Sequence, residues 1–325
     1  MTNPSPRLSV SLGLWQDSDP LEALDTAARA DELGYDELWI GEMATFDAFA
    51  LGAAVAARTE RIPLTIGPLA VAVRDPMALA LGTASVAALG GGRPVGLGLG
   101  SSSPAVVAGW HGREWSRPAA RLREAAEAVR PLLAGERGAG GYRLRLAPPA
   151  GPLTVAAFGD RSIAVAAELA DRMVVNLVTP ELAARLAGEL ARRADGAPPP
   201  LAAWIVAAVD PSDEALAQMS RGVVPYLAAP GYGEMFAAAG FGELVEAARS
   251  GTHPRELLER VPAELPHAIG LVGSPAEAGS RAAAFLEAGV EELVLVPATA
   301  GDPGGERTLR ALRNVIGAAP AGERT

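Results

Sequence analysis

Short apolar runs alternate with amphipathic stretches along almost the whole chain. The apolar runs are five to nine residues long, a length typical of strands and too short for most helices. Most of them are continuously apolar rather than alternating, which favours strands buried on both faces of a parallel sheet. This pattern predicts eight strands, at residues 8–14, 37–41, 63–71, 94–100, 153–158, 173–178, 201–209 and 292–298.

The stretches between these strands carry signals for the start and end of helices. Residues 28–40 and 283–296 repeat one pattern, in which a helix, a glycine, an apolar residue and two acids precede a strand. Four predicted helix starts place a capping side chain before a proline, which suits the first helical position. These four are Asp19-Pro20, Asp75-Pro76, Thr179-Pro180 and Ser274-Pro275.

Eight strand–helix units predict an α/β protein with the TIM (β/α)8 barrel fold. We expect one domain over residues 1–325, with its core at about 7–317. Two insertions are expected, a β-hairpin at 135–152 after the fourth helix and a helical insertion at about 220–266 before the eighth strand. The second insertion is rich in glycine and is expected to form a lid over the site. A doubly wound open sheet is the alternative architecture.

Charge and hydropathy limit the possible partners. The formal net charge of −10 disfavours binding to nucleic acid or to an anionic membrane, because both require a basic face. No apolar run approaches the roughly 18 residues of a membrane span. The N-terminal residues lack the charged and then apolar build of a signal peptide, so we expect a cytoplasmic protein.

The composition also limits the chemistry that the side chains can perform. All 28 basic residues are arginine, and the chain contains no cysteine. Schiff-base chemistry and thiolate chemistry are therefore excluded. The histidines, His111, His253 and His267, lie far apart, and no metal site is predicted from their spacing. An enzyme of this composition needs a cofactor for its reactive step.

Glycines alternate with apolar residues at 96, 98 and 100, just before three serines. A dinucleotide-binding fingerprint would follow the first strand and lead directly into a helix. Here the glycines lie within the fourth strand, and the next helix is expected only from about Pro118. On one face of a barrel strand, they either clear space for a ligand or relieve crowding inside the barrel.

Several longer stretches resemble the luciferase-like family of flavin and deazaflavin oxidoreductases, most closely its branch that uses coenzyme F420. They include "ADELGYDELWIGE", "DPMALALGTASVAALGGGRPVGLGLGSSSP" and "GWHGREWSRPAARLREAAEAVRPLLAGE". Further matches are "LTVAAFGDRSIAVAAELADRMVVN" and, more weakly, "GSPAEAGSRAAAFLEAGVEELVLVP". The resemblance implies a luciferase-like TIM barrel with a deazaflavin or flavin ring in its mouth, and it also implies a homodimer.

The resemblance further implies where the cofactor binds. The phosphate is expected at the helix that follows the fifth strand, where Arg161 either contacts it or lies in solvent. A cis peptide is often found after the third strand in this family, and Gly67-Pro68 occupies that place as either a cis bond or an ordinary trans bend. The implied cofactor contacts are Gly67, Pro68, Leu69, Leu99, Gly100, Ser101, Ser102, Ala157, Phe158, Gly159, Asp160, Arg161 and Ser162.

The chain departs from the sugar-phosphate dehydrogenases of this family at two catalytic places. Where those enzymes have Asp-His and a glutamate, this chain has Glu42-Met43 and Ser101. The catalytic candidates are therefore Glu42, His111 and Ser101, although Glu42 could cap the next loop and His111 could be structural. Candidates for the walls of a substrate pocket are Trp15, Met43, Phe46 and Trp110, each of which could instead serve packing.

Three functions remain open from the sequence. The first is hydride transfer between coenzyme F420 and a small organic substrate. The second is a monooxygenase of the same fold that depends on flavin mononucleotide (FMN). The third is a barrel that binds a flavin without turnover. A metal-dependent hydrolase is disfavoured because the predicted strand ends lack clusters of histidine and aspartate.

Overall fold

The computed structural model describes residues 6–317 of the chain. Their contacts divide them into two compact units, with 6–35, 175–187 and 202–317 in unit 1 and 36–174 and 188–201 in unit 2. Parallel strands alternate with helices in both units, and the fold is the (β/α)8 barrel predicted from the sequence. The assignment of the whole chain to a single domain stays a prediction. Within residues 6–317, no helix is long and apolar enough to cross a membrane.

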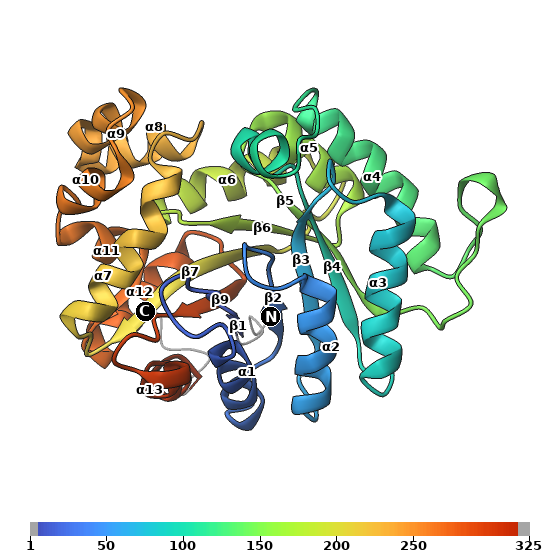
Figure 1. Cartoon of the computed structure of the whole chain (residues 1–325), viewed down its shortest axis with the longest axis horizontal. Coiled ribbons are helices and arrows are strands. Elements are labelled where there is room, and N and C mark those ends of the chain that lie inside the picture. The colour runs from blue at the N-terminus through green and yellow to red at the C-terminus, as the bar shows by residue number, and fades with distance from the viewer. Residues whose placement is uncertain (1–5, 318–325) are drawn as a thin grey trace. The chain divides into compact units, whose positions relative to one another are not determined.

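Unit 2 contains five parallel strands that are hydrogen-bonded in chain order. They are β2 (Leu38–Ile40), β3 (Leu64–Ala70), β4 (Val95–Gly100), β5 (Ala150–Ala156) and β6 (Arg172–Asn176). Figure 1 shows the helices α2 and α3 side by side along this part of the sheet. The helices that connect these strands are α2 (Ala48–Arg58), α3 (Pro76–Leu89), α4 (Pro118–Leu133) and α5 (Asp160–Leu169).

Unit 1 contains four parallel strands in the order β1, β9, β7 and β8. They are β1 (Arg7–Ser11), β9 (Glu292–Pro297), β7 (Leu201–Val209) and β8 (Leu271–Gly273). The eight predicted strands are all present, and β8 is an additional strand that pairs only with the last three residues of β7. Three residues are too few for an apolar run to be recognised, which explains why β8 was missed. The helices between these strands include α1 (Glu22–Glu32), α7 (Asp213–Val223), α12 (Pro275–Glu287) and α13 (Glu306–Gly317), and α6 (Pro180–Arg193) follows β6.

Three of the four predicted helix starts are correct. Asp75 and Ser274 cap α3 and α12 with their side chains, and α6 begins at Pro180. The fourth prediction is wrong by two residues, because Asp19 accepts a hydrogen bond from the Leu21 N–H and helical geometry begins only at Glu22. The local turn competes with the helix for the aspartate side chain.

The structure contradicts the prediction for the first insertion and agrees with the helical content predicted for the second. The hairpin predicted at 135–152 is wrong, since a 3₁₀ turn at Ala139–Gly141 leads through irregular chain to β5, which begins at Ala150. Pro148 and Pro149 cannot donate to a ladder of strand hydrogen bonds, which disfavours a second hairpin strand. The insertion at 220–266 is helical, as expected, although its role as a lid stays a prediction. It contains short 3₁₀ and π segments and α8 (Tyr232–Phe236), α9 (Gly242–Arg249), α10 (Pro254–Glu259) and α11 (Glu264–Ile269).

The repeated pattern before β2 and β9 places one buried acid at the start of each strand. In each acid pair the first carboxylate is exposed and the second, Glu37 or Glu292, is at most 2% exposed. The Arg172 guanidinium binds both oxygens of Glu37, with N–O distances of 2.8 and 2.9 Å. Ser9 Oγ donates to Glu292 Oε1 at 2.7 Å. Buried carboxylates of this kind require such partners, because an uncompensated charge is very costly to bury.

Candidate active site

Small residues meet at the carboxyl ends of β3, β4 and β5. Pro68 and Ala156 are partly exposed, although the three residues directly before each of them are buried. A Cβ atom placed on Gly100 would lie 3.3 Å from Pro68 Cβ and 3.7 Å from Ala156 Cβ, so the three residues are neighbours. We call Pro68, Gly100 and Ala156 the small-residue floor. In (β/α)8 barrels the active site lies at the carboxyl ends of the strands, so we expect a ligand to bind at the small-residue floor.

The Gly67–Pro68 peptide bond is cis, as expected from the resemblance. Gly67 adopts φ of 121°, and a Cβ atom there would lie only 2.3 Å from the Gly98 carbonyl oxygen. A Cβ atom on Gly98 would in turn lie 3.1 Å from Pro68 Cα, and one on Gly96 would lie 2.4 Å from Thr65 Oγ1. Gly96 and Gly98 therefore relieve crowding between strands, and only Gly100 belongs to the floor itself.

Leu69 and Leu99 were expected to contact a cofactor. Both side chains are fully buried, and the two residues are partners in the β3–β4 register. Leu99 alternates with Gly98 and Gly100 along β4, so its side chain points to the opposite face of the sheet. Only the backbone of these leucines could therefore reach a ligand on the floor.

The Glu42 carboxylate is held by an ion pair in the loop that follows β2. Arg74, from the loop that follows β3, donates to Glu42 Oε1 and also to Asp47 Oδ2 at 2.5 Å. The Ala48 N–H lies 3.4 Å from Glu42 Oε1, so Glu42 also helps to cap α2. The Arg74 guanidinium lies 5.3 Å from the centre of the Phe49 ring. Glu42 is thus held in place as a hydrogen-bond acceptor.

Burial and ion pairing act in opposite directions on this cluster. Burial favours the neutral forms of Asp47 and Arg74. It is outweighed at Asp47, where hydrogen bonds from the Ala50 N–H and from Arg74 hold the carboxyl pKa below its ordinary value. It is also outweighed at Arg74, where hydrogen bonds to Glu42 and Asp47 raise the guanidinium pKa. The positive charge of Arg74 is therefore balanced within the protein.

The loop after β4 carries the other two catalytic candidates. Ser101 is half-buried, and its hydroxyl donates to the Pro118 carbonyl oxygen at 3.4 Å. Ser102 is exposed with φ of 64°. The loop was expected to lack helix before Pro118, but a π-helix spans Ala105–Trp110, with Val106 N–H donating to Ser103 Oγ at 3.4 Å. Trp110 is 59% exposed, and His111 directly after this helix is also exposed.

The start of α5 has the features expected of an anion site. The helix begins at Asp160, and its capping residue Gly159 offers no side-chain hydrogen bond. The first backbone N–H groups are therefore not capped in the way that Asp47 and Asp75 cap α2 and α3. Arg161 is exposed beside them. Of the other predicted contacts here, Ala157 is buried, Asp160 is exposed, and Phe158 and Ser162 are half-buried.

The predicted pocket walls do not form one described cluster. Met43 and Phe46 lie in the loop after β2 of unit 2, where Met43 is 42% exposed and Phe46 is half-buried. Trp110 belongs to the same unit. Trp15 belongs to unit 1, where its indole N–H donates to the Pro297 carbonyl oxygen at 2.9 Å, so this side chain is fixed by the end of β9.

A residue of α7 that sequence reasoning missed joins two loops at the carboxyl ends of β1 and β9. Gln218 is 1% exposed, and its Oε1 accepts from the N–H groups of Thr299 at 2.8 Å and Ala300 at 3.1 Å. Its Nε2 donates to Asp17 at 3.2 Å, and Arg221 pairs with the same carboxylate. Burial opposes the ionised form of Asp17, but the bonds from Arg221 and Gln218 still lower its pKa. A glutamine inside an otherwise ordinary amphipathic helix gives no signal of this role.

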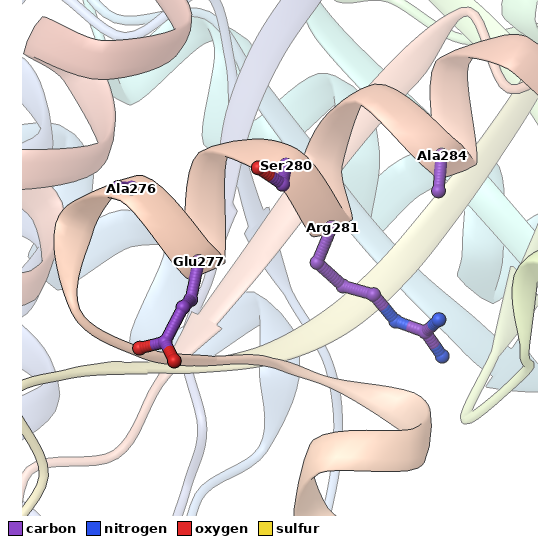
Figure 2. Close-up of a pocket in the computed structure, with 5 residues that line it drawn as sticks. All are labelled: Ala276, Glu277, Ser280, Arg281 and Ala284. Carbon is purple, nitrogen blue, oxygen red and sulfur yellow. The ribbon is translucent and has the colours of Figure 1, made fainter.

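A surface hollow lies on α12 in unit 1. Ala276, Ser280 and Ala284 line it together with Glu277 and Arg281, whose side chains leave the helix in different directions (Figure 2). Glu277 belongs to the capping box of α12, and Arg281 donates to the Ala268 carbonyl oxygen. These contacts assign the hollow to helix packing. Among residues 6–317, no group of three or more acids and histidines could hold a metal ion.

Comparison with known proteins identifies several relatives. The family model described as luciferase-like monooxygenase matches residues 7–292. A protein of Mycobacterium tuberculosis, provisionally named as a coenzyme F420-dependent oxidoreductase, is 30% identical over 199 residues, which cover 54% of this chain and 57% of that protein. The match therefore spans little more than half the length of this relative.

Two solved structures resemble the whole fold. Coenzyme F420-dependent tetrahydromethanopterin reductase from Methanopyrus kandleri has a TM-score of 0.75 at 19% identity, covering 94% of this chain and 97% of that one. The oxygenating constituent of 3,6-diketocamphane monooxygenase from Pseudomonas putida, in complex with FMN, has a TM-score of 0.67 at 18% identity, covering 96% and 98%. At these identities the likeness shows a shared fold and no more.

Proposed function

Because this chain belongs to the luciferase-like monooxygenase family, we propose that it is an oxidoreductase that transfers a hydride between coenzyme F420 and a small organic substrate. The name of the Mycobacterium tuberculosis relative supports F420 as the cofactor. FMN is the second candidate, because a protein of similar fold was solved with FMN bound.

The observation that carries this proposal is the small-residue floor. A flat ring system needs a surface from which no side chain projects, and Gly100 between Pro68 and Ala156 provides one. Both neighbours are partly exposed, and each follows three buried residues of its strand. The residues present therefore fit the face of a deazaflavin or flavin ring.

The start of α5 would hold the phosphate of the same cofactor. Backbone N–H groups at a helix start carry partial positive charge and attract anions. Arg161 would add a charged contact, and a guanidinium can bind phosphate through two hydrogen bonds. Asp160 is the unfavourable neighbour, although Arg193 lies 3.7 Å from its carboxylate and offsets part of the negative charge.

When bound, the coenzyme would supply the group that accepts or donates the hydride. The protein would contribute positioning and proton transfer. The Glu42 carboxylate, fixed by Arg74, would accept a hydrogen bond from the ring or from the substrate. The His111 imidazole is the candidate proton carrier, because its ring is exposed in the loop after β4. The Ser101 hydroxyl is directed to the Pro118 carbonyl and would act through its backbone.

The proposal includes assembly as a homodimer through α3. This helix contains no charged residue, yet Met77, Leu81 and Leu89 on it are 45%, 44% and 74% exposed. A helix that is apolar on all sides is normally covered. A second copy of the same chain could cover this stripe, because a two-fold interface pairs one surface with itself.

Cofactor binding to the purified full chain tests the function. We expect F420 to bind and to be reduced or reoxidised when a substrate is present, as followed by its visible absorbance. Tight binding of FMN with no binding of F420 would favour the monooxygenase. Binding of either cofactor without turnover, for every substrate offered, would favour a barrel that only binds a flavin.

A substitution on the floor tests the site. Gly100→Val places a branched side chain between Pro68 and Ala156, and we expect F420 to bind about 5- to 150-fold more weakly because overpacking typically costs about 1–3 kcal/mol. Gly188→Val is the matched control, since a Cβ atom at Gly188 meets no atom within 4 Å. Unchanged F420 affinity in a folded Gly100→Val protein would contradict the placement of the ring.

A further inference from the structure

Two large apolar side chains are exposed in the loops on either side of the floor strand β3. Met43 follows β2 and is 42% exposed, and Trp110 follows β4 and is 59% exposed. The strands β2 and β4 are the two hydrogen-bonded neighbours of β3, so both loops leave the same end of the sheet as Pro68. Exposed apolar residues of this size in loops at the end of the sheet that carries a candidate site indicate contact with an apolar partner.

The charges in the same loops are largely balanced inside the protein. Arg74 pairs with Glu42 and Asp47, as described above. Further along the loop after β4, Glu114 pairs with Arg121 at 3.3 Å. Asp75 is engaged as the cap of α3, where it accepts from the Ala78 N–H at 2.9 Å.

Two basic side chains in these loops have no ion-pair partner among residues 6–317, namely His111 and Arg113, and Arg161 in the first turn of α5 has none either. Arg161 is assigned to the cofactor phosphate in the proposed function. His111 is the candidate proton carrier. Arg113 is therefore the single remaining group in the described loops that could select a negatively charged substrate.

We propose that the substrate is an uncharged, predominantly apolar organic molecule that contacts Met43 and Trp110. This inference rests on the proposed function, because it concerns the substrate of the same site. It disfavours sugar phosphates and other polyanions, because a polyanion needs several free cations and the loops after β2, β3 and β4 supply at most Arg113.

The test is a titration of the full chain, with F420 present, with the uncharged ketones from 2-pentanone to 2-nonanone. Isothermal titration calorimetry reports binding without any need for turnover. We expect the association constant to rise about fourfold for each added methylene, which corresponds to burial of one CH₂ group. Carboxylates of the same carbon number are expected to bind more weakly than the ketones.

Variants locate the binding surface. Met43→Gln and Trp110→Gln should each reduce the rise in affinity per methylene. Leu146→Gln is the matched control, because Leu146 is 37% exposed in the same unit but lies between α4 and β5. A rise that is identical in all three variants would overturn the proposal, since binding would then be non-specific.

Two further outcomes would also overturn it. An association constant that does not change with the chain length of the ketone would exclude an apolar binding surface at Met43 and Trp110. Carboxylates that bind more tightly than ketones, and lose this advantage in Arg113→Gln, would show selection of an anion instead. Binding of F420 is measured separately by its absorbance. Failure of F420 to bind while the ketone series keeps its dependence on chain length would reject the proposed function but leave the apolar surface standing.

Discussion

The Glu37 and Arg172 side chains form a two-point ion pair that is almost completely removed from water. Each is at most 3% exposed. Thr65 and Thr154 bond to the same pair, and the guanidinium lies 4.2 Å from the Trp39 ring centre. Every side of the guanidinium therefore has a partner within unit 2. Such a pair contributes less to net stability than its geometry suggests, because both charges had to be desolvated.

Removing one partner of this pair is expected to be far more damaging than replacing both. Glu37→Leu and Arg172→Met should each lower the free energy of unfolding by about 3–5 kcal/mol, because an uncompensated guanidinium or carboxylate stays buried. The combined Glu37→Leu and Arg172→Met protein should lose clearly less than the sum of the single losses. Urea unfolding of the three variants measures this, and additive losses would show that the two residues act independently.

The sequence pattern before β2 predicted the helix, the glycine and the strand correctly, but it could not distinguish the two acids. Asp36 and Glu37 look equivalent in the sequence, and only the pairing of Glu37 with Arg172 across the sheet separates them. That partner is 135 residues away in the chain. Long-range pairings of this kind leave no local signal in a single sequence.

At the scale of elements, α7 acts as an anchor for the loops that follow β1 and β9. Gln218 uses its amide oxygen for two backbone N–H groups and its amide nitrogen for Asp17. Gly222 lies against Trp15, where a Cβ atom would be 3.1 Å from the indole ring. The helix therefore fixes both loops by polar bonds and by close packing. Any lid motion of the 220–266 insertion must then begin after α7 rather than before it.

Loss of the Gln218 amide is expected to loosen both loops together. Gln218→Ala leaves the buried Thr299 N–H without its acceptor, at about 1–3 kcal/mol, and also removes the acceptor of the part-buried Ala300 N–H. We expect a lower melting temperature and faster amide hydrogen exchange at these two residues. Ser220→Ala on the same helix is the control, because its hydroxyl donates only to the Leu216 carbonyl. Equal exchange rates in Gln218→Ala and wild type would refute the anchor.

At the scale of the whole molecule, the pattern of apolar and polar residues predicted most of the fold, because long parallel strands and capped helices leave strong local patterns. The eight strands and the start of α5 followed from the sequence, whereas β8 was too short and the hairpin at 135–152 lacked a partner strand. The resemblance left Gly67–Pro68 open as a cis bond or a trans bend, and the structure has it cis. The ion pair between Arg74 and Glu42 could not be predicted from the sequence, because it depends on a contact between two loops. The roles of the site residues stay predictions.

The exposed apolar side chains of α3 are the basis of the homodimer that we propose. Leu81 is 44% exposed near the middle of the helix, so Leu81→Glu places a charge at the centre of any interface formed there. Burying that carboxylate against its own copy across a two-fold axis would bring two like charges together, and the dimer should dissociate.

Sedimentation velocity should then show a dimer for wild type and a monomer for Leu81→Glu. Leu146→Glu adds the same charge at another exposed leucine and should remain dimeric. A wild-type monomer at micromolar concentration, or a Leu81→Glu dimer as stable as wild type, would exclude α3 as the interface, and its exposed leucines and methionine would then need another partner.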